Sequence, residues 1–148
     1  MEKPVTEKPA TDLLPHRDPF LFIDRIISAD KKGCVGERTF KDTEWFFKGH
    51  FPGYPVVPGV ILTETMAQCG GAGIVAAGLI ENKIFLLAAL EGVRFRRQVR
   101  PNETVRIEVE ITKFSQRLVK QRGKVFVGDE LAAEGEWICI MLEKEKGA

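Results

Sequence analysis

Hydrophobic and polar residues alternate most regularly in the second half of the chain. From Val105 to Ile111 every second residue is apolar, and charged residues stand between them. A period of two is typical of a strand that has one buried face. Together with the composition of the flanking segments, it predicts strands over 84–90, 93–99, 104–114, 118–127 and 131–142, with a tight hairpin turn at Gly128-Asp129.

Two shorter stretches near the N-terminus predict a hairpin. Residues 20–27 are aromatic and β-branched, residues 34–40 alternate in part, and residues 31–33 between them are typical of a turn. Residues 1–10 mix charge and proline and have no apolar period. We therefore expect a flexible lead-in over residues 1–10, followed by a single domain over residues 11–148.

The longest apolar run lies between these two groups of strands. After Pro58, which suits the first turn of a helix, residues 59–78 are apolar on nearly every side. A helix of that kind is buried from several directions, so in a small protein a sheet must cover it. The order of elements predicts an α+β domain in which a curled antiparallel β-sheet wraps around one long central helix.

A membrane span is the alternative interpretation of the same run. Pro58 and five glycines interrupt the stretch from residue 56 to residue 80, and no Lys/Arg cluster brackets its ends. Glu64 and Gln68 would lie in lipid at a considerable cost. We therefore expect no membrane span.

Charge and cysteine content narrow the class of protein. The net charge of +1 provides no overall field for binding nucleic acid. The three cysteines, Cys34, Cys69 and Cys139, are odd in number and form no CxxC pair, which favours a reducing compartment over a disulfide scaffold. The charged start of the chain lacks the apolar stretch of a signal peptide. We expect a cytoplasmic protein.

The sequence lacks the residues that several types of catalytic site require. The only histidines, His16 and His50, have no metal-ligand spacing between them, so we expect no metal site. A serine hydrolase is also unsupported, because the chain has no GxSxG motif. Cys69 could act as a nucleophile, but a small residue buried on an apolar helix is the favoured interpretation.

Glu64 is the residue that stands out. It is the only charged residue between His50 and Glu81, within a helix that has no obvious polar face. Glutamate is rarely buried unless it is paired, and burial favours its protonated form, which can act as a general acid. A buried acid with a purely structural partner is an equally open interpretation at this point.

His50 precedes that helix on an irregular loop, so the two side chains could meet in one cleft, within a subunit or across an interface. Histidine is the ordinary general base at physiological pH. The backbone N–H groups of Gly59 and Val60 at the helix start could hold a carbonyl oxygen as charge develops on it. This physics predicts an acid/base site, and leaves dehydration, thioester hydrolysis and amide chemistry open.

The motifs around these residues resemble those of the FabZ-type 3-hydroxyacyl-acyl-carrier-protein dehydratases, which have the hotdog fold. The resemblance covers residues 13–142, and its most specific stretches are Gly49-His50-Phe51-Pro52-Gly53, Pro58-Gly59-Val60 and Glu64-Thr65-Met66-Ala67-Gln68. Leu14-Pro15-His16-Arg17 and Val93-Arg94-Phe95-Arg96-Arg97 support it.

The resemblance implies specific roles for these residues. His50 would remove a proton from C2 of the substrate, and Glu64 would protonate the departing 3-hydroxyl group. The Gly59 amide would polarise the thioester carbonyl, and Gln68 would orient the Glu64 carboxylate. The related dehydratase-isomerases carry aspartate in place of Glu64, so the glutamate favours plain dehydration. No cofactor is expected.

The same resemblance implies partners. The active site would form across a homodimer, with His50 and Glu64 from different subunits, and dimers commonly assemble as a trimer of dimers. An acyl carrier protein would dock near a basic cluster and deliver its acyl-phosphopantetheine arm into a tunnel; the cluster comprises Arg94, Arg96, Arg97 and Arg100.

Purely structural roles for these residues, and other functions for the protein, are alternative interpretations. The arginines could simply keep a strand edge soluble, and nothing about them indicates nucleic-acid binding. Tyr54 and Phe51 could line the tunnel, although packing within the loop is the favoured interpretation of Tyr54. The rival functions are a hotdog thioesterase and a non-catalytic acyl-binding subunit.

Overall fold

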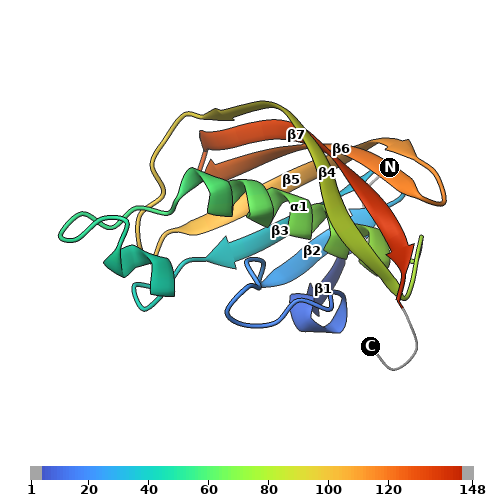
Figure 1. The fold of residues 1–148 in the computed structure, drawn as a ribbon, viewed down its shortest axis with the longest axis horizontal. Helices are drawn as coiled ribbons and strands as arrows, with labels where there is room; N and C mark the ends of the chain where they lie inside the picture. The colour runs from blue at the N-terminus through green and yellow to red at the C-terminus, as the bar shows by residue number, and fades with distance from the viewer. Residues whose placement is uncertain (1–4, 145–148) are drawn as a thin grey trace.

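The structure, a computed structural model, describes residues 5–144. One α-helix, α1 (Gly59–Ala76), lies across the concave face of a curled antiparallel sheet (Figure 1). The predicted α+β architecture is therefore confirmed. Within residues 5–144, no helix combines the length and the apolar character that a membrane span needs.

The sheet has seven strands, and every neighbouring pair is antiparallel. Their order across the sheet is β1-β2-β3-β5-β6-β7-β4, so β1 and β4 form its two edges. The strands are β1 (Val5–Pro9), β2 (Arg25–Asp30), β3 (Gly33–Thr39), β4 (Lys83–Phe95), β5 (Thr104–Phe114), β6 (Leu118–Val127) and β7 (Glu130–Glu143). Two short 3-10 helices, η1 (Ala10–Asp12) and η2 (Trp45–Lys48), complete the elements.

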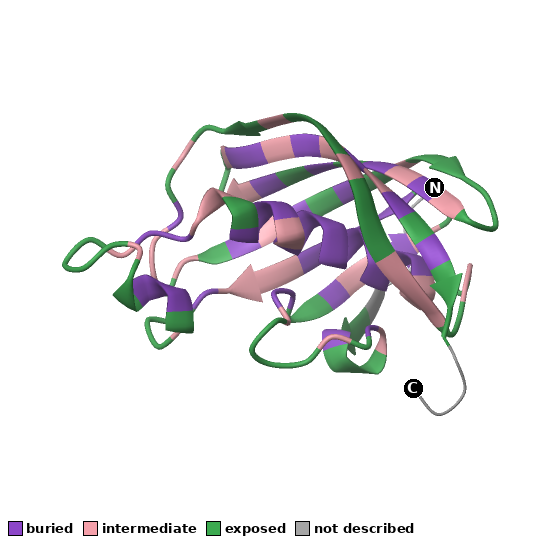
Figure 2. Cartoon of the chain, viewed as in Figure 1, coloured by how far each residue is buried: buried purple, intermediate pink, exposed green. Residues whose placement is uncertain are grey.

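Burial follows the two periods that the sequence predicts. Buried and exposed residues alternate along β5, β6 and β7, while α1 is buried on nearly all sides (Figure 2). From Ile61 to Ile74 every residue of α1 is buried except Glu64, which is half-buried. The helix therefore meets the outside of the fold at one polar position.

Glycines let α1 approach the sheet closely. A Cβ atom on Gly73 would clash with the side chain of Cys34 on β3, and one on Gly70 would clash with Gln121 on β6. The predicted helix over 59–78 ends at Ala76, because Gly78 has a φ of +74° and turns the chain away. These small residues bring the helix backbone to van der Waals distance of the strands.

Three boundaries differ from the sequence predictions, two of them in the N-terminal part of the chain. The strand expected over 20–27 begins only at Arg25, because the backbone of residues 20–22 bonds the side chain of Gln68 in place of a neighbouring strand. Residues 5–9 form β1 and pair with β2, where a flexible lead-in was expected. Backbone pairing does not require an apolar pattern, which explains the second error. Residues 1–4 of that expected lead-in lie outside the described part.

The third difference concerns β4. The strands expected over 84–90 and 93–99 form one strand that ends at Phe95, and residues 96–103 form a loop. Gly92, with a φ of +58°, takes part in an irregularity of the ladder with β7 between Glu91 and Arg94. The gap expected between the two strands is therefore a bulge within one strand.

One buried hydrogen-bond network ties α1 to the sheet and can be tested. Gln121, which is 1% exposed, donates to the Gly70 carbonyl at 3.2 Å and accepts from the Trp137 indole N–H at 3.0 Å. Gln121→Leu leaves two buried groups unsatisfied, so we expect the free energy of unfolding to fall by about 1–3 kcal/mol or more. Urea denaturation measures this, with the exposed Gln116→Leu as control; equal losses in the two variants would contradict the prediction.

Candidate active site

His50 lies in a loop whose hydrogen bonds fix the ring. The backbone N–H of Val56 donates to the His50 carbonyl at 3.0 Å, and the Nδ1 atom of His50 lies 2.9 Å from the Val56 carbonyl oxygen. A carbonyl oxygen can only accept, so Nδ1 carries the proton of the neutral ring. The lone pair of the ring is then on Nε2, the arrangement that a general base requires.

A cavity of about 390 Å³ lies beside His50 and joins the loop, the start of α1 and the segment after β4. Its walls are largely apolar and include Gly59, Leu62, Phe95 and Val99. A Cβ atom on Gly59 would lie 2.9 Å from the Phe95 ring, so only glycine allows this close approach. The cavity can receive an apolar group beside the imidazole.

The first amides of α1 border this cavity through Gly59. The helix begins at Gly59, and the Pro58 carbonyl accepts the N–H groups of Ile61 and Leu62. The amides of Gly59 and Val60 precede these bonds, at the positive end of the helix dipole. His50 and Gly59 thus line the same cavity.

Glu64 is held by Gln68, one helical turn further on. The Gln68 amide donates from Nε2 to Glu64 Oε2 at 2.9 Å and to the Phe20 carbonyl at 3.1 Å. Its Oε1 atom accepts the Phe22 N–H at 2.8 Å. Because Gln68 is 3% exposed and all its bonds agree on one amide orientation, it presents a fixed donor to the carboxylate.

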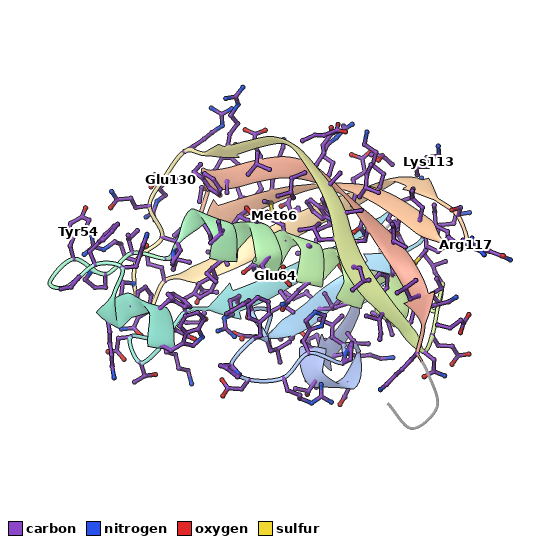
Figure 3. The ribbon with its side chains drawn as sticks, in the orientation of Figure 1. Tyr54, Glu64, Met66, Lys113, Arg117 and Glu130 are labelled. Carbon is purple, nitrogen blue, oxygen red and sulfur yellow. The ribbon has the colours of Figure 1, made fainter. Side chains whose placement is uncertain are left out.

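The two halves of the predicted site lie apart in the single chain. Glu64 projects near the middle of α1, whereas the loop that carries Tyr54, and with it His50, extends beyond the start of the helix (Figure 3). Glu64 is not among the residues that line the His50 cavity. One subunit therefore joins His50 with Gly59, and Glu64 with Gln68, without joining the two pairs.

His16 belongs to the Glu64 half, although the sequence motifs predicted no catalytic role for it. It lines a small cavity with Gln68, and its Nδ1 atom is buried with no hydrogen-bond partner within residues 5–144. Burial lowers the pKa of His16, the Glu64 carboxylate opposes that shift, and Arg17 adds to it. Two sequence signals pointed to His16, namely the rarity of histidine in this chain and the place of His16 in the motif Leu14-Pro15-His16-Arg17.

The structure also bears on Cys69. Its side chain is fully buried, and its sulfur lies 3.9 Å from that of Cys34. The hydrogen bond with Cys34 and burial raise the pKa of Cys69 well above its usual range. A thiol that resists ionisation is a poor nucleophile, which agrees with a structural role.

Phe51 contacts its own loop, whereas Tyr54 contacts the loop that follows β4. Phe51 stacks on the His50 ring with centroids 4.1 Å apart. The Tyr54 hydroxyl donates to Gln98 at 2.8 Å, and the Arg100 guanidinium lies 4.3 Å from the centre of its ring. Neither aromatic side chain lines the His50 cavity in the single chain.

Carboxylates neutralise part of the predicted basic cluster. Arg96 pairs with Glu134 at 2.6 Å, and Arg97 pairs with Glu103 at 2.9 Å and with Glu130 at 3.3 Å. The hydrogen bond from Arg97 is the main cause that lowers the pKa of Glu103. Within the described residues Arg94 and Arg100 form no ion pair, so they are the more available charges of the four.

Comparison with known proteins identifies close relatives of the chain. A family model described as a FabA-like domain matches residues 14–136. The 3-hydroxyacyl-acyl-carrier-protein dehydratase FabZ of Moorella thermoacetica is 43% identical over 133 residues, covering 89% of this chain and 93% of that protein. The protein of the same name from Desulforamulus reducens is 47% identical, with coverage of 89% and 94%.

Solved structures share the fold. The dehydratase heterocomplex ApeI:P from Xenorhabdus doucetiae matches with a TM-score of 0.78 at 15% identity, covering 94% of each chain. A hypothetical thioesterase from Streptococcus pneumoniae, solved with coenzyme A, matches with a TM-score of 0.62 at 6% identity, covering 82% of this chain and 87% of that one. At these identities the likeness shows the hotdog fold and no more.

The proximity of His16 to Glu64 can be measured. We expect the pKa of His16 to lie below the ordinary value of 6.5, because burial disfavours its charged form. In Glu64→Gln it should fall further, since the carboxylate that favours the imidazolium is lost. NMR titration of the imidazole Cε1 proton, assigned with His50→Asn, measures both values. The exposed Glu81→Gln is the control, and an unchanged His16 pKa in Glu64→Gln would contradict the predicted contact.

Proposed function

The chain belongs to the FabA-like family, and from this membership we propose that it dehydrates 3-hydroxyacyl thioesters on acyl carrier protein to trans-2-enoyl thioesters in fatty acid synthesis. One domain would carry the activity, and it includes β1, which precedes the expected boundary at residue 11. The observation that supports this most directly is the His50 geometry, in which Nδ1 bonds Val56 and Nε2 is left as a base beside a cavity.

Each described group has a task in the elimination. Nε2 of His50 takes the C2 proton, and the electrons of that C–H bond form the C2=C3 double bond. The C3–O bond breaks as Glu64 gives its proton to the hydroxyl group, which leaves as water. The Gly59 amide donates to the thioester carbonyl oxygen, where negative charge develops. Proton exchange with solvent then returns His50 and Glu64 to the states in which they began the reaction.

Gln68 prepares Glu64 for this step. Its Nε2 donor bonds one carboxyl oxygen, so the other oxygen remains to carry the proton toward the substrate. The same amide is anchored to the backbone of Phe20 and Phe22. A donor that cannot turn away limits the rotation of the Glu64 carboxyl group, which favours a productive geometry.

A second copy of the chain would unite the two halves of the site. In the single chain His50 and Glu64 do not share a cavity, and β4 is a 13-residue edge strand with no partner on its outer side among residues 5–144. Long open edges of this kind are normally covered. Large apolar side chains on and beside this edge are 42–52% exposed, namely Leu86, Leu87, Leu90 and Phe95. We propose a homodimer through β4, with a trimer of dimers as the larger assembly.

The carrier protein would approach at the mouth of the His50 cavity. Arg96 and Arg97 line that cavity, and Arg94 and Arg100 lie near it in the sequence. An acidic carrier protein could bind Arg94 and Arg100, which form no ion pair among the described residues. The ion pairs of Arg96 and Arg97 would hold the loop in its conformation. The three cysteines are free thiols, which supports a cytoplasmic location.

Product analysis tests the proposed reaction. Incubation with a 3-hydroxyacyl carrier substrate should produce enoyl absorbance, and His50→Ala or Glu64→Gln should lower kcat by about 10²-fold or more, as loss of a general base or acid does. Glu81→Gln, an exposed acid, should leave kcat unchanged, and circular dichroism should show all three variants folded. Thiol release without enoyl product would indicate a thioesterase, and absence of any turnover would indicate a non-catalytic subunit; either outcome refutes the dehydratase.

Subunit exchange tests the shared site. If His50 and Glu64 of different subunits form each site, a mixed dimer of His50→Ala and Glu64→Gln chains has one intact site and one doubly defective site. An equal mixture of the two inactive proteins should therefore recover about a quarter of wild-type activity after exchange. Each variant mixed with itself is the control. No recovery after demonstrated exchange would place both residues in the same subunit's site.

A further inference from the structure

Small side chains follow Glu64 along α1 and line a small cavity, which is called the groove below. Ala67 and Gly71 stand three and seven residues after Glu64, which places them on the same face of the helix. With Gln68 they line a cavity of about 20 Å³, distinct from the one beside His50. Its other walls come from the N-terminal loop, β4 and β7, and are formed by Leu14, His16, Phe85, Leu87 and Cys139.

Phe85 closes this groove. A Cβ atom placed on Gly71 would lie 3.2 Å from the Phe85 ring, so the ring rests directly on the helix at that glycine. Phe85 pairs across the sheet with Met141, which is 2% exposed, so both side chains face the concave side. Gly71 is seven residues beyond Glu64, or about 10 Å along the helix at 1.5 Å per residue.

The chemistry of the walls suits a hydrocarbon chain. Apart from His16 and Gln68 at the Glu64 end, the lining is apolar. Burial keeps the pKa of His16 low, so the imidazole there is largely uncharged near neutral pH. During the proposed reaction C3 lies beside Glu64 and the thioester lies toward His50, so the rest of the acyl chain must leave Glu64 in the other direction.

We propose that Phe85 sets the upper limit of acyl-chain length by closing the groove that runs from Glu64 past Ala67 and Gly71. This inference rests on the proposed function and deepens it. The cavity of about 20 Å³ has room for about one water molecule, so with the ring in place only a short chain fits. Removal of the ring opens the groove toward the C-terminal end of α1.

The experiment compares chain lengths. We would measure kcat/KM of wild type, Phe85→Ala and Phe85→Leu with four-, six-, eight- and ten-carbon 3-hydroxyacyl carrier substrates. Each methylene newly buried is worth roughly fourfold, so Phe85→Ala should raise the ten- to four-carbon ratio by about tenfold or more. Phe85→Leu should shift it less and in the same direction. Gly71→Ala, whose new methyl group pushes on the ring, should lower the ratio.

Phe126→Ala is the matched control. Phe126 lies on β6, its ring is covered by the Arg106 guanidinium, and it does not line the groove. It should leave the ratio at the wild-type value. Thermal unfolding shows which variants are folded, and if Phe85→Ala is not, Phe85→Leu and Gly71→Ala decide. An unchanged ratio in the folded Phe85 variants, or a shift equal to that of Phe126→Ala, overturns the proposal.

A binding measurement separates this inference from the proposed function. Calorimetry with non-reacting acyl-pantetheine amides of the same four lengths measures how tightly the groove binds each acyl chain, and it requires no turnover. If no protein dehydrates any substrate, the proposed function fails, and the length dependence of amide binding still decides the role of Phe85. Affinity that falls with length in wild type and rises with length in Phe85→Ala supports the inference, and parallel profiles refute it.

Discussion

The fold depends on covering α1, a helix that is apolar on almost every side. Burial of such a surface is the dominant favourable contribution to folding, and a single flat sheet could cover only one side of the helix. The seven strands therefore curl around it, and Gly70 and Gly73 let the helix backbone approach β6 and β3. The buried side-chain amides of Gln68 and Gln121 then form directional hydrogen bonds, which prevent the helix from rotating about its axis.

The cover is incomplete at one place, and the proposed general acid lies there. Glu64 is the only residue between Ile61 and Ile74 that is not buried. A carboxyl group at the opening is partly desolvated, bonded by a fixed donor, and accessible to a substrate. The loop before the helix, which no sheet covers, holds His50 by its own backbone bonds. Rigid packing and an irregular loop thus supply the two halves of an acid/base site.

Edge strand β4 links architecture, assembly and specificity. One side of it pairs with β7, its concave face carries Phe85 against Gly71, and its free edge offers an apolar surface to a second copy. A dimer through this edge would bring the His50 half of one chain toward the Glu64 half of the other. The same strand would then determine how the site is completed and how long a chain it accepts.

The sequence by itself determined the elements and the chemical candidates. Alternation within residues 105–111 predicted β5, and strand-like composition predicted β6, both at their observed bounds. The apolar run predicted α1, because these patterns reflect which faces are buried. The family motifs identified His50, Glu64, Gly59 and Gln68. Local pattern could not find the start of β2 at Arg25, since a side chain 46 residues further along the chain takes the Phe22 N–H that a strand would use.

Only the tertiary structure decided how these candidates are grouped. The pairing of β1, the bulge at Gly92, the place of His16 beside Gln68 and the closure at Phe85 arise from contacts between segments far apart in the chain. Such contacts leave no local period in the sequence. The separation of His50 from Glu64 within one chain likewise depends on the folded structure, and it is the observation on which the proposed dimeric site rests.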